Sequence, residues 1–288
     1  MAPAGDPILS VLIVTYHSAL SILHCLNSVT RHLATIPHDI HVVDNASQDE
    51  TVSLVKTHSP RVALIPNECN RGFATAINQG LKQSRGRYVL WLNPDAELLD
   101  GRIAHLIRYL EENPRIGILG PRLIDPDGKR QLSCRSFPSY QTAFFNRYSL
   151  LSRLFPKNRY TRRYLHSDWN GETVREVDWV SGACLLHRRE VSKQLGGLDE
   201  RFFMYCEDVD FCLRANQVGW LTRYHPAARV LHHVGGSSRQ IRRRMVFERH
   251  HSMWRYYCKH FQRKPLKDLI VGAALWARCG LIMLRKGG

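Results

Sequence analysis

The sequence predicts an α/β fold in which helices flank a mostly parallel, Rossmann-like sheet. Its 288 residues, 44% of them hydrophobic, are enough for one large domain or two small ones with a buried core. Short apolar runs of strand length alternate with segments of helical periodicity at the start of the chain. This alternation is typical of parallel strands joined by helices that cover the sheet.

The first part of the chain supplies strands and helices in turn. The predicted elements are a strand at Ile8–Thr15, a helix at Ala19–Leu33, a strand at Ile40–Asp44, a helix near Asp49–Thr57, a strand at Val62–Pro66, a helix at Ala74–Gln83 and a strand at Tyr88–Leu92. Ligands of such sheets bind at the carboxyl ends of the strands, near the point where the strand order reverses.

Later segments are less regular. We expect a helix at Arg102–Asn113, a short strand at Ile116–Gly120, a turn at Asp125–Gly128, loops and short helices over Arg135–Asp178, a strand at Val177–His187 and a helix at Asp208–Val218. Two basic helices, Arg242–Phe261 and Lys267–Arg285, are expected to follow.

Positive charge is concentrated at the end of the chain. The formal net charge is +16, and residues 239–288 hold 13 Lys or Arg against only Glu248 and Asp268. We therefore divide the chain into a globular domain over residues 1–240 and a basic, amphipathic helical tail over residues 241–288. Such a tail favours phosphate, in nucleic acid or at an anionic membrane surface.

Cysteine spacing and the apolar segments indicate the compartment. The eight cysteines are scattered without a CxxC pair, so we expect a reduced, cytoplasmic protein rather than a zinc or redox site. No basic segment precedes the apolar run Ile8–Val14, which argues against a signal peptide. Within Leu266–Leu284 the longest uncharged run is Leu269–Ala277, much shorter than the ~20 apolar residues of a membrane span.

Polar and acidic residues follow three of the predicted strands. Thr15-Tyr16 ends the first, Asp44–Asp49 follows the second and Asn93–Asp95 follows the fourth. Because parallel strands end at one edge, these groups should meet where a nucleotide binds, and a carboxylate there can accept hydrogen bonds from a base or a ribose. The alternative is that Asp44–Ser47 caps the next helix, which is the expected role of Ser47.

The loop Asn67–Gly80 adds a weaker nucleotide signal. Gly72 permits a tight turn, and Arg71 offers a fork of donors suited to a phosphate. The sequence contains no GxGxxG after the first strand and no GxxxxGK[ST], which weighs against a dinucleotide enzyme and a P-loop ATPase.

A family resemblance rests on several segments in their order along the chain. Five of them are Asp44-Asn-Ala-Ser47, Asn70-Arg-Gly-Phe73, Asn93-Pro-Asp95, Trp179-Val-Ser-Gly-Ala183 and Phe203-Met-Tyr-Cys-Glu-Asp-Val-Asp210. Over roughly residues 8–240 the chain resembles an inverting family 2 glycosyltransferase of the GT-A fold. Arg135–Pro138, Glu176–Trp179 and His232–Ser237 also resemble the pattern of bacterial rhamnosyltransferases.

The resemblance implies that an acceptor hydroxyl displaces a nucleoside diphosphate from the anomeric carbon of a sugar. The leaving diphosphate needs a divalent cation or basic donors, and the hydroxyl needs a carboxylate that takes its proton. The donor nucleotide is thereby assigned to Thr15, Tyr16, Asp44, Asn45, Arg71, Gly72, Asn93 and Asp95.

The resemblance also implies a metal site for Mg²⁺ or Mn²⁺. Asp95 resembles the second acid of the family's DxD motif, but Asn93 replaces the first acid, so one formal charge stands where two are usual. Mg²⁺ can be held by one or two carboxylates together with substrate phosphates and waters. His232 or His233 resembles a late metal ligand or phosphate contact, and the sequence does not choose between them.

The acidic run at residues 207–210 is expected to hold the catalytic base. Asp208 resembles the family's base, and Glu207 is expected to contact the acceptor or to orient its neighbour. Acidic residues also favour helix N-termini for structural reasons alone. Asp210 and Arg214 are four residues apart on the predicted helix, so we expect them to form an ion pair.

The segment that begins at Trp179 resembles the floor of the sugar and acceptor site. We assign Trp179, Ser181 and Gly182 to the sugar or the acceptor. Trp179 could stack on a sugar, although a buried tryptophan is equally ordinary in a core.

The basic tail suggests where the acceptor lies. Its Arg and Lys residues flank an apolar segment, as in interfacial helices that bind anionic lipid. We expect a peripheral enzyme on the inner face of the plasma membrane that adds rhamnose from dTDP-rhamnose to a lipid-linked or cell-envelope glycan. A UDP- or GDP-sugar donor is the alternative. The tail could also simply pack on the body with its charges solvated.

Other function classes fit the sequence less well. A nucleic-acid binder would account for the charge, but we recognise no helix-turn-helix, RRM or zinc-finger pattern, so we expect no nucleic-acid partner. A sugar-nucleotide pyrophosphorylase usually has a glycine-rich basic loop after the first strand, which Val14–Ser18 is not. A structural protein with a decayed site is disfavoured by Asp44, Asp95 and Asp208.

Overall fold

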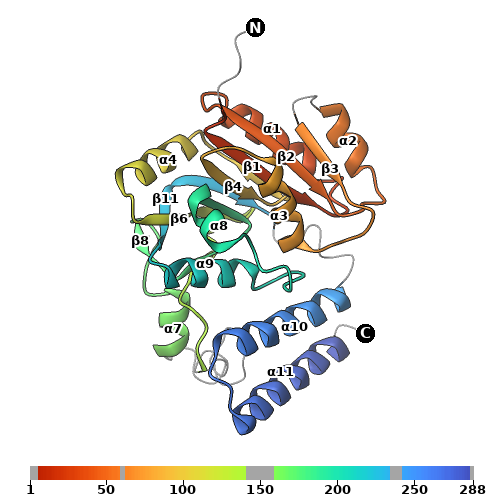
Figure 1. Cartoon of the computed structure of the whole chain (residues 1–288), viewed down its shortest axis with the longest axis vertical. Helices are drawn as coiled ribbons and strands as arrows, with labels where there is room; N and C mark the ends of the chain where they lie inside the picture. The colour runs from red at the N-terminus through yellow and green to blue at the C-terminus, as the bar shows by residue number, and fades with distance from the viewer. Residues whose placement is uncertain (1–5, 59–61, 141–158, 234–241, 286–288) are drawn as a thin grey trace.

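One sheet organises the fold. A computed structural model describes residues 6–58, 62–140, 159–233 and 242–285 of the chain. Within these residues nine strands form a sheet in the order β3-β2-β1-β4-β10-β6-β11-β5, and β8 pairs with β11. The sheet occupies the upper half of the molecule in Figure 1.

Most strands of this sheet run in one direction, as the sequence predicts. The parallel set consists of β1 (Leu9–Thr15), β2 (His38–Asp44), β3 (Val62–Pro66), β4 (Tyr88–Leu92), β6 (Ile116–Ile124) and β11 (Leu221–His232). The antiparallel strands are β10 (Cys184–Arg188), between β4 and β6, and β5 (Ala96–Leu98) and β8 (Arg175–Glu176), both beside β11. A separate two-stranded ladder joins β7 (Cys134–Arg135) to β9 (Trp179–Val180).

Helices cover both faces of the sheet. The described helices are α1 (Ile22–His32), α2 (Thr51–His58), α3 (Phe73–Gln83), α4 (Ile103–Glu112), α7 (Arg159–Leu165), α8 (Arg189–Leu195), α9 (Glu207–Gln217), α10 (Arg242–His260) and α11 (Pro265–Arg285), of which α10 and α11 lie below α9 rather than on the sheet. β1 shows why both faces are filled: Leu9 and Val11 pack in the core that contains α1 and α4, whereas Leu12 packs in the core that contains α3 and α9. Strands buried on both faces read as continuous apolar runs, which is what made them predictable.

The structure corrects several predicted elements. The segment Val177–His187 is not one strand, because the chain turns at Ser181–Ala183 between β9 and β10. β6 continues beyond Gly120 to Ile124. β5, α8 and β11 were not predicted from the sequence. β11 is only partly buried, it mixes charged with apolar residues, and its register shifts between His225 and Arg229. Its pattern therefore differs from that of a buried strand.

The C-terminal residues form the two predicted helices. α10 lies below α9, and α11 packs along α10 as the lower layer of the molecule (Figure 1). Among the helices that the structure describes, none combines the length and apolar content needed to cross a membrane. Residues 141–158 of the expected loop region, and residues 234–237 of the His232–Ser237 segment, lie outside the described residues.

Candidate active site

A cavity of about 310 Å³ opens at the carboxyl ends of β1, β2 and β4. Several segments far apart in the sequence form its wall. The lining residues are Val14, Thr15, Tyr16, Asn45, Asn70, Gly72, Phe73, Asn93, Pro94, Asp95, Ser181, Gly182, Ala183, Phe203, Met204, Tyr205, Glu207, Asp208, His232, Arg244, Met245 and Arg249. The cavity therefore lies at the sheet edge where the sequence places a nucleotide.

Asp44 stabilises this edge of the sheet through hydrogen bonds within the protein. Its side chain is buried, and its Oδ1 accepts hydrogen bonds from Thr15 Oγ1 at 2.7 Å and from Ser47 Oγ at 2.6 Å. Its Oδ2 accepts from the Ser47 backbone N–H at 2.8 Å. Asp44 is therefore not among the lining residues; it fixes the loop from which Asn45 reaches the cavity.

Gly72 joins the nucleotide loop to the loop before α9. Its φ is +84°, and a Cβ on it would lie 2.4 Å from the Phe203 carbonyl oxygen. The next residue, Phe73, donates its backbone N–H to that same oxygen at 2.7 Å. Asn45 Nδ2 donates to the Gly72 carbonyl at 3.2 Å. A side chain at position 72 would separate these loops, so the predicted glycine is required here.

At the candidate metal position, the side chain of Asp95 lies next to that of His232 and not next to that of His233. His232 Nε2 lies 3.6 Å from Asp95 Oδ1, whereas His233 Nε2 lies 3.8 Å from Glu97 Oε1. Gln131 Nε2 donates to the His232 carbonyl oxygen, and Gln131 Oε1 lies 2.9 Å from His232 Nδ1. The Gln131 oxygen can only accept a hydrogen bond, so Nδ1 is the donor in this contact and Nε2 is the ring nitrogen that faces Asp95.

This pair fits a metal that also binds substrate. In the described part of the chain no three His, Cys, Asp or Glu side chains gather as a metal site. Asp95 and His232 would supply two ligands, and the diphosphate oxygens and waters would supply the rest, as Mg²⁺ often requires. His233 faces Glu97 instead and does not line the cavity.

Asp208 is held in place at the N-terminus of α9. Its Oδ2 accepts the Gly182 backbone N–H at 3.0 Å, and its Oδ1 accepts the Val209 N–H at 2.8 Å. Burial raises the pKa of Asp208, although these N–H donors and Arg135 oppose the shift. The turn at residues 181–183 that interrupts the predicted strand thus presents Gly182 to Asp208.

Glu207 is more deeply buried than its neighbour. Its Oε2 has no hydrogen-bond partner among the described residues, and its side chain lines the cavity. Burial and the adjacent charge of Asp208 raise the pKa of Glu207 well above its usual range. Two carboxyls in one wall, with one oxygen left for a ligand, are suited to proton transfer with a hydroxyl.

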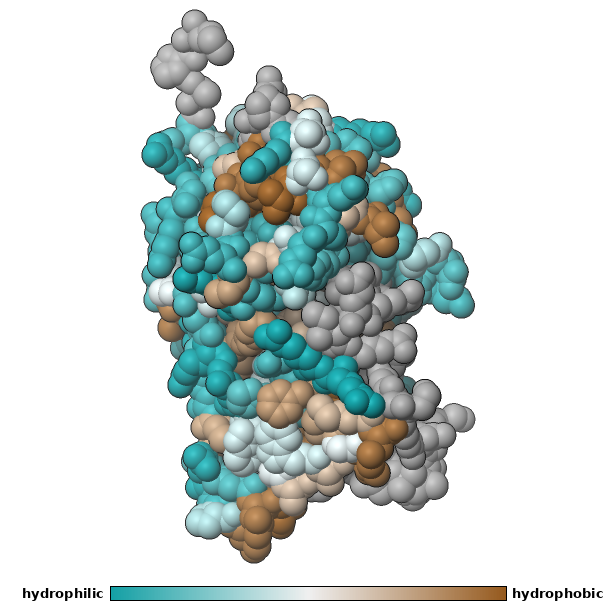
Figure 2. All heavy atoms as spheres, turned by 90° about the vertical axis from the view of Figure 1, so that its right-hand side faces the viewer, coloured by the Kyte–Doolittle hydropathy of each residue, from teal (hydrophilic) through white to brown (hydrophobic). Residues whose placement is uncertain are grey.

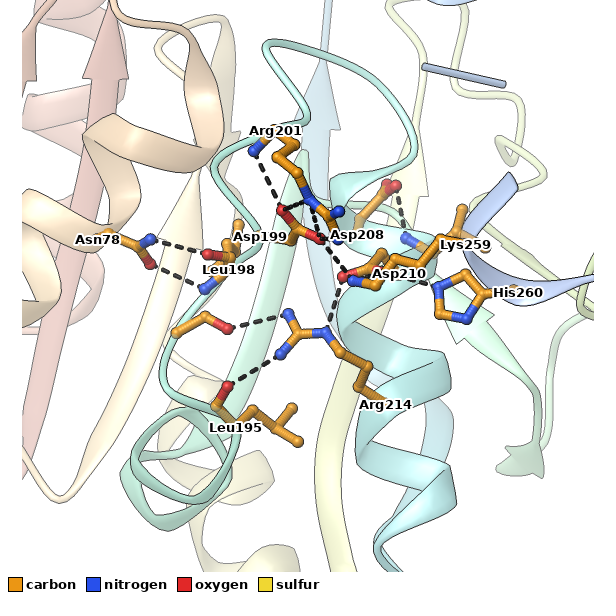
Figure 3. Close-up of polar contacts among 12 residues, drawn as sticks. Asn78, Leu195, Leu198, Asp199, Arg201, Asp208, Asp210, Arg214, Lys259 and His260 are labelled. Atoms are coloured by element: carbon orange, nitrogen blue, oxygen red, sulfur yellow. Dashed lines mark hydrogen bonds and ion pairs between the residues drawn. The ribbon is translucent and has the colours of Figure 1, made fainter. Parts of the chain in front are cut away.

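Asp210 belongs to the support of the site rather than to its wall. It is fully buried, and Arg214 donates to its Oδ2 at 2.8 Å, as predicted. Its Oδ1 also accepts from Lys259 Nζ at 2.6 Å and contacts His260 Nε2 at 2.7 Å. Figure 3 shows Lys259 and His260 reaching Asp210 from α10. The charges of the tail therefore anchor α10 beside the acidic pair.

Two other predicted residues lie away from the cavity. Arg71 is exposed and is not among the lining residues. Trp179 is buried in the core with its Nε1 donating to the Ser136 carbonyl at 3.0 Å and with Arg135 over its ring. Its indole is thus covered by protein. Ser181 and Gly182, from the same segment, do line the cavity.

The part of the cavity wall that α10 contributes was not predicted from the sequence. Arg244, Met245 and Arg249 line the cavity, together with the loop that contains Phe203 and Tyr205. The sequence marked the arginines only as tail charge. No local pattern reveals that α10 folds back against a loop some forty residues earlier.

Comparisons with known sequences agree with this geometry. The family model described as glycosyl transferase family 2 matches residues 10–169. An N-acetylglucosaminyl-diphospho-decaprenol L-rhamnosyltransferase of Mycobacterium tuberculosis is 36% identical over 243 residues, covering 80% of this chain and 78% of that protein. Rhamnosyltransferase WbbL of Escherichia coli is 29% identical over 175 residues, covering 60% of this chain and 62% of that protein.

Solved structures share the fold. The mannosyltransferase PcManGT from Pyrobaculum calidifontis, in complex with GDP-Man and Mn²⁺, aligns with a TM-score of 0.60 at 19% identity, over 98% of this chain and 76% of that chain. The structure of GalNAc-T7 with UDP, GalNAc and Mn²⁺ aligns with a TM-score of 0.58 at 16% identity, over 79% of this chain and 44% of that chain. The chain is therefore a glycosyltransferase of the GT-A fold and belongs to glycosyl transferase family 2.

Proposed function

We propose that this enzyme transfers rhamnose from a nucleoside diphosphate donor to a hydroxyl of a lipid-linked glycan, with inversion at the anomeric carbon. The observation that carries the proposal is the fixed carboxylate of Asp208 in a cavity that also contains Asp95 and His232. The relatives named as rhamnosyltransferases, one of them acting by its name on N-acetylglucosaminyl-diphospho-decaprenol, support the choice of sugar and acceptor.

The reaction is a single displacement. The acceptor oxygen forms a bond to the anomeric carbon while the bond from that carbon to the diphosphate oxygen breaks. The hydroxyl proton passes to Asp208, whose raised pKa makes it a stronger base than an exposed aspartate. Glu207, with its unpartnered Oε2, holds a second acceptor hydroxyl by a hydrogen bond. Attack from the face opposite the leaving group inverts the configuration.

The donor binds along the sheet edge. Thr15, Tyr16, Asn45 and Gly72 hold the nucleoside, and Asn93 lies next to the diphosphate. Asp95 and His232 would hold Mg²⁺ or Mn²⁺, which neutralises charge on the leaving diphosphate when bound. The donor is dTDP-rhamnose in this proposal, and UDP- and GDP-sugars are the alternatives.

The acceptor reaches the enzyme at a membrane surface. α11 exposes large apolar side chains, and Figure 2 shows hydrophobic atoms at the lower end of the molecule, where Figure 1 places α10 and α11. The apolar residues of this face are Leu266, Leu269, Ile270, Trp276, Leu281 and Leu284. A partly apolar, basic helix of this kind lies in the interface of an anionic bilayer. We place the enzyme on the inner face of the plasma membrane.

Substitution of Asp208 by Asn tests the base. We expect kcat to fall about 10²- to 10⁴-fold, the usual contribution of a general base, while the dissociation constant for the nucleotide stays close to that of the wild type. Asp127→Asn, in the exposed turn at residues 125–128, is the matched control and should leave kcat unchanged. Near-normal turnover of Asp208→Asn would refute the assignment of the base.

A thermal-shift series identifies the donor. The purified protein is heated with dTDP, UDP, GDP or their sugars, with and without Mg²⁺ or Mn²⁺. A ligand at a hundred times its dissociation constant stabilises the fold by about 2.7 kcal/mol. We expect a metal-assisted shift with dTDP-rhamnose. A shift with UDP- or GDP-sugars only would change the donor, and a shift only with RNA or DNA would refute the proposal.

A further inference from the structure

Two arginines of α10 lie at the cavity without an acidic partner among the described residues. Arg244 and Arg249 line it, and each is exposed at the surface of its helix. The Arg244 guanidinium carbon lies 5.0 Å from the centre of the Phe203 ring, and that of Arg249 lies 4.7 Å from the centre of the Tyr205 ring. Within the described residues neither guanidinium forms an ion pair with a carboxylate.

A lysine in the last turn of α10 differs from these arginines. Lys259 Nζ lies 2.6 Å from both Asp199 and Asp210, so its charge is neutralised in the fold. Stacking on an aromatic face orients a guanidinium but leaves its N–H donors and its charge for another partner. α10 therefore uses its last turn for anchoring and presents two oriented cations at the cavity.

The loop before α9 fixes the position of both arginines. Tyr205 and Cys206 have φ angles of +71° and +64°, a left-handed turn that brings the loop round to the start of α9. Ser252 Oγ of α10 donates to the Met204 carbonyl at 2.8 Å. The helix and the loop are thus joined at the point where Tyr205 meets Arg249. The arginines keep their places relative to Glu207 and Asp208, which follow on the same chain segment.

Chemistry indicates what these cations bind. The cavity wall carries three carboxyl groups, Asp95, Glu207 and Asp208, which would repel a bare anion. A planar guanidinium binds phosphate oxygens in pairs, and two of them a few residues apart suit a diphosphate. A diphosphate is present on both substrates of the proposed reaction, on the sugar donor and on the lipid-linked acceptor.

We propose that Arg244 and Arg249 form a subsite for the diphosphate of the lipid-linked acceptor. The inference rests on the proposed function and extends it to the lipid side of the substrate. Asp95 and His232 already lie where the leaving diphosphate of the donor would be held. The arginines come instead from α10, the helix that packs against α11 and its exposed leucines. A diphosphate whose lipid chain lies at that surface reaches the cavity past α10.

Direct binding tests the subsite without sugar transfer. Binding of farnesyl diphosphate to the full chain is measured by calorimetry for the wild type, Arg244→Gln, Arg249→Gln and the double variant. Loss of one charged hydrogen-bonding group should weaken binding roughly 10- to 100-fold. Arg243→Gln is the matched control, because Arg243 is exposed on the same helix and does not line the cavity. It should bind as the wild type does.

A second ligand distinguishes the two possible sources of the diphosphate. Binding of dTDP with Mg²⁺ should be unchanged in Arg244→Gln, Arg249→Gln and the double variant. If dTDP binding weakens while farnesyl diphosphate binding does not, the arginines serve the donor and the acceptor assignment is overturned. If neither ligand is affected, there is no diphosphate subsite on α10.

Kinetics provide an independent arm. With a diphosphate-linked acceptor the substitutions should raise the acceptor KM roughly 10- to 100-fold, and with a neutral alkyl glycoside of the same sugar they should not change KM. An equal rise with both acceptors would overturn the proposal. An enzyme that binds farnesyl diphosphate through these arginines but transfers no rhamnose would retain the subsite and refute the proposed function.

Discussion

α10 and α11 are consecutive helices of one basic tail, yet the fold uses them differently. α10 inserts charge into the body, with Lys259 and His260 on the buried Asp210, and Tyr256 and Tyr257 are almost fully covered. α11 packs on α10 and leaves Leu266, Leu269 and Leu284 about 70% exposed or more. The sequence shows the net positive charge of the tail. It does not show which of the two helices packs against the globular domain.

The difference between the helices depends on what each one faces. α10 lies against the first turn of α9, where buried carboxylates would be costly without cations. α11 packs mainly on the outer face of α10, through contacts such as the hydrogen bond from Tyr257 OH to Asp268 Oδ1 at 2.8 Å, and Lys267 also lies over the Tyr140 ring. A basic residue that pairs with a buried acid stabilises the fold. A basic residue without such a partner remains available for a ligand.

The largest expected effect comes from removing the anchor of α10. Asp210→Ala leaves Lys259, His260 and Arg214 without their shared buried partner. We expect the free energy of unfolding, measured with urea, to fall by about 3–5 kcal/mol, as when one member of a buried ion pair is removed. Asp268→Asn in α11 is the control. Its loss of unfolding free energy should be clearly smaller, because solvent screens the ion pair of Asp268 with the exposed Arg263. Equal losses would remove the distinction between the helices.

Acid should weaken the sheet before it releases α10. Burial lowers the pKa of His187 to about 4 from 6.5. The folded state thus resists its protonation, so stability is fully present above the unfolded pKa of 6.5 and falls as the pH drops toward 4. A shift of this size is worth about 3 kcal/mol. Burial alone would raise the pKa of Asp210, but His260, Lys259 and Arg214 lower it, so it stays ionised in this window.

Urea unfolding at several pH values checks this order. His187→Leu should flatten the loss of stability between pH 6.5 and 4, whereas Arg244→Gln in α10 should keep the wild-type slope in that range. A slope unchanged by His187→Leu would show that this histidine does not contribute to it.

The smallest effect on stability is expected on the apolar face of α11. Leu269→Glu and Leu284→Glu change exposed positions, so the free energy of unfolding should move by no more than ~0.5 kcal/mol. Binding to anionic vesicles should fall about 10-fold for each, because a leucine no longer enters the interface. Val218→Glu, an exposed apolar position at the end of α9, is the control. Vesicle binding that survives both substitutions would contradict the interfacial role of α11.

Residues that act through local patterns could be predicted. Gly72 was assigned from the tight loop that its neighbours predict, and Asp208 was assigned from its resemblance to the family's base at the start of an acidic helix. Their surroundings were not visible in the sequence. Nothing in it shows that Phe203 packs on Gly72, or that the Gly182 N–H fixes Asp208.

Some other predicted site residues do not line the cavity, because packing decides which side chains are buried. Asp44 lies at the expected sheet edge, but its hydrogen bonds are made to Thr15 and Ser47. Trp179 lies in the separate β7–β9 ladder, and Arg135 covers its ring. His232 and His233 could not be separated by sequence. β11 ends at His232, which lies beside Asp95, and the next residue, His233, lies beside Glu97, so the end of the strand separates the two side chains.

The sequence by itself determined the alternating architecture, the sheet edge that carries the site, the acidic pair and the presence of two C-terminal helices. These follow from hydrophobic periodicity and from residues that are neighbours in the chain. Only the tertiary structure decided that α10 completes the cavity while α11 remains open on one face. That outcome depends on the contacts of Lys259 with the half-buried Asp199 and the buried Asp210. These residues are some fifty or sixty positions apart in the chain, and the contacts exist only once the helices are packed together.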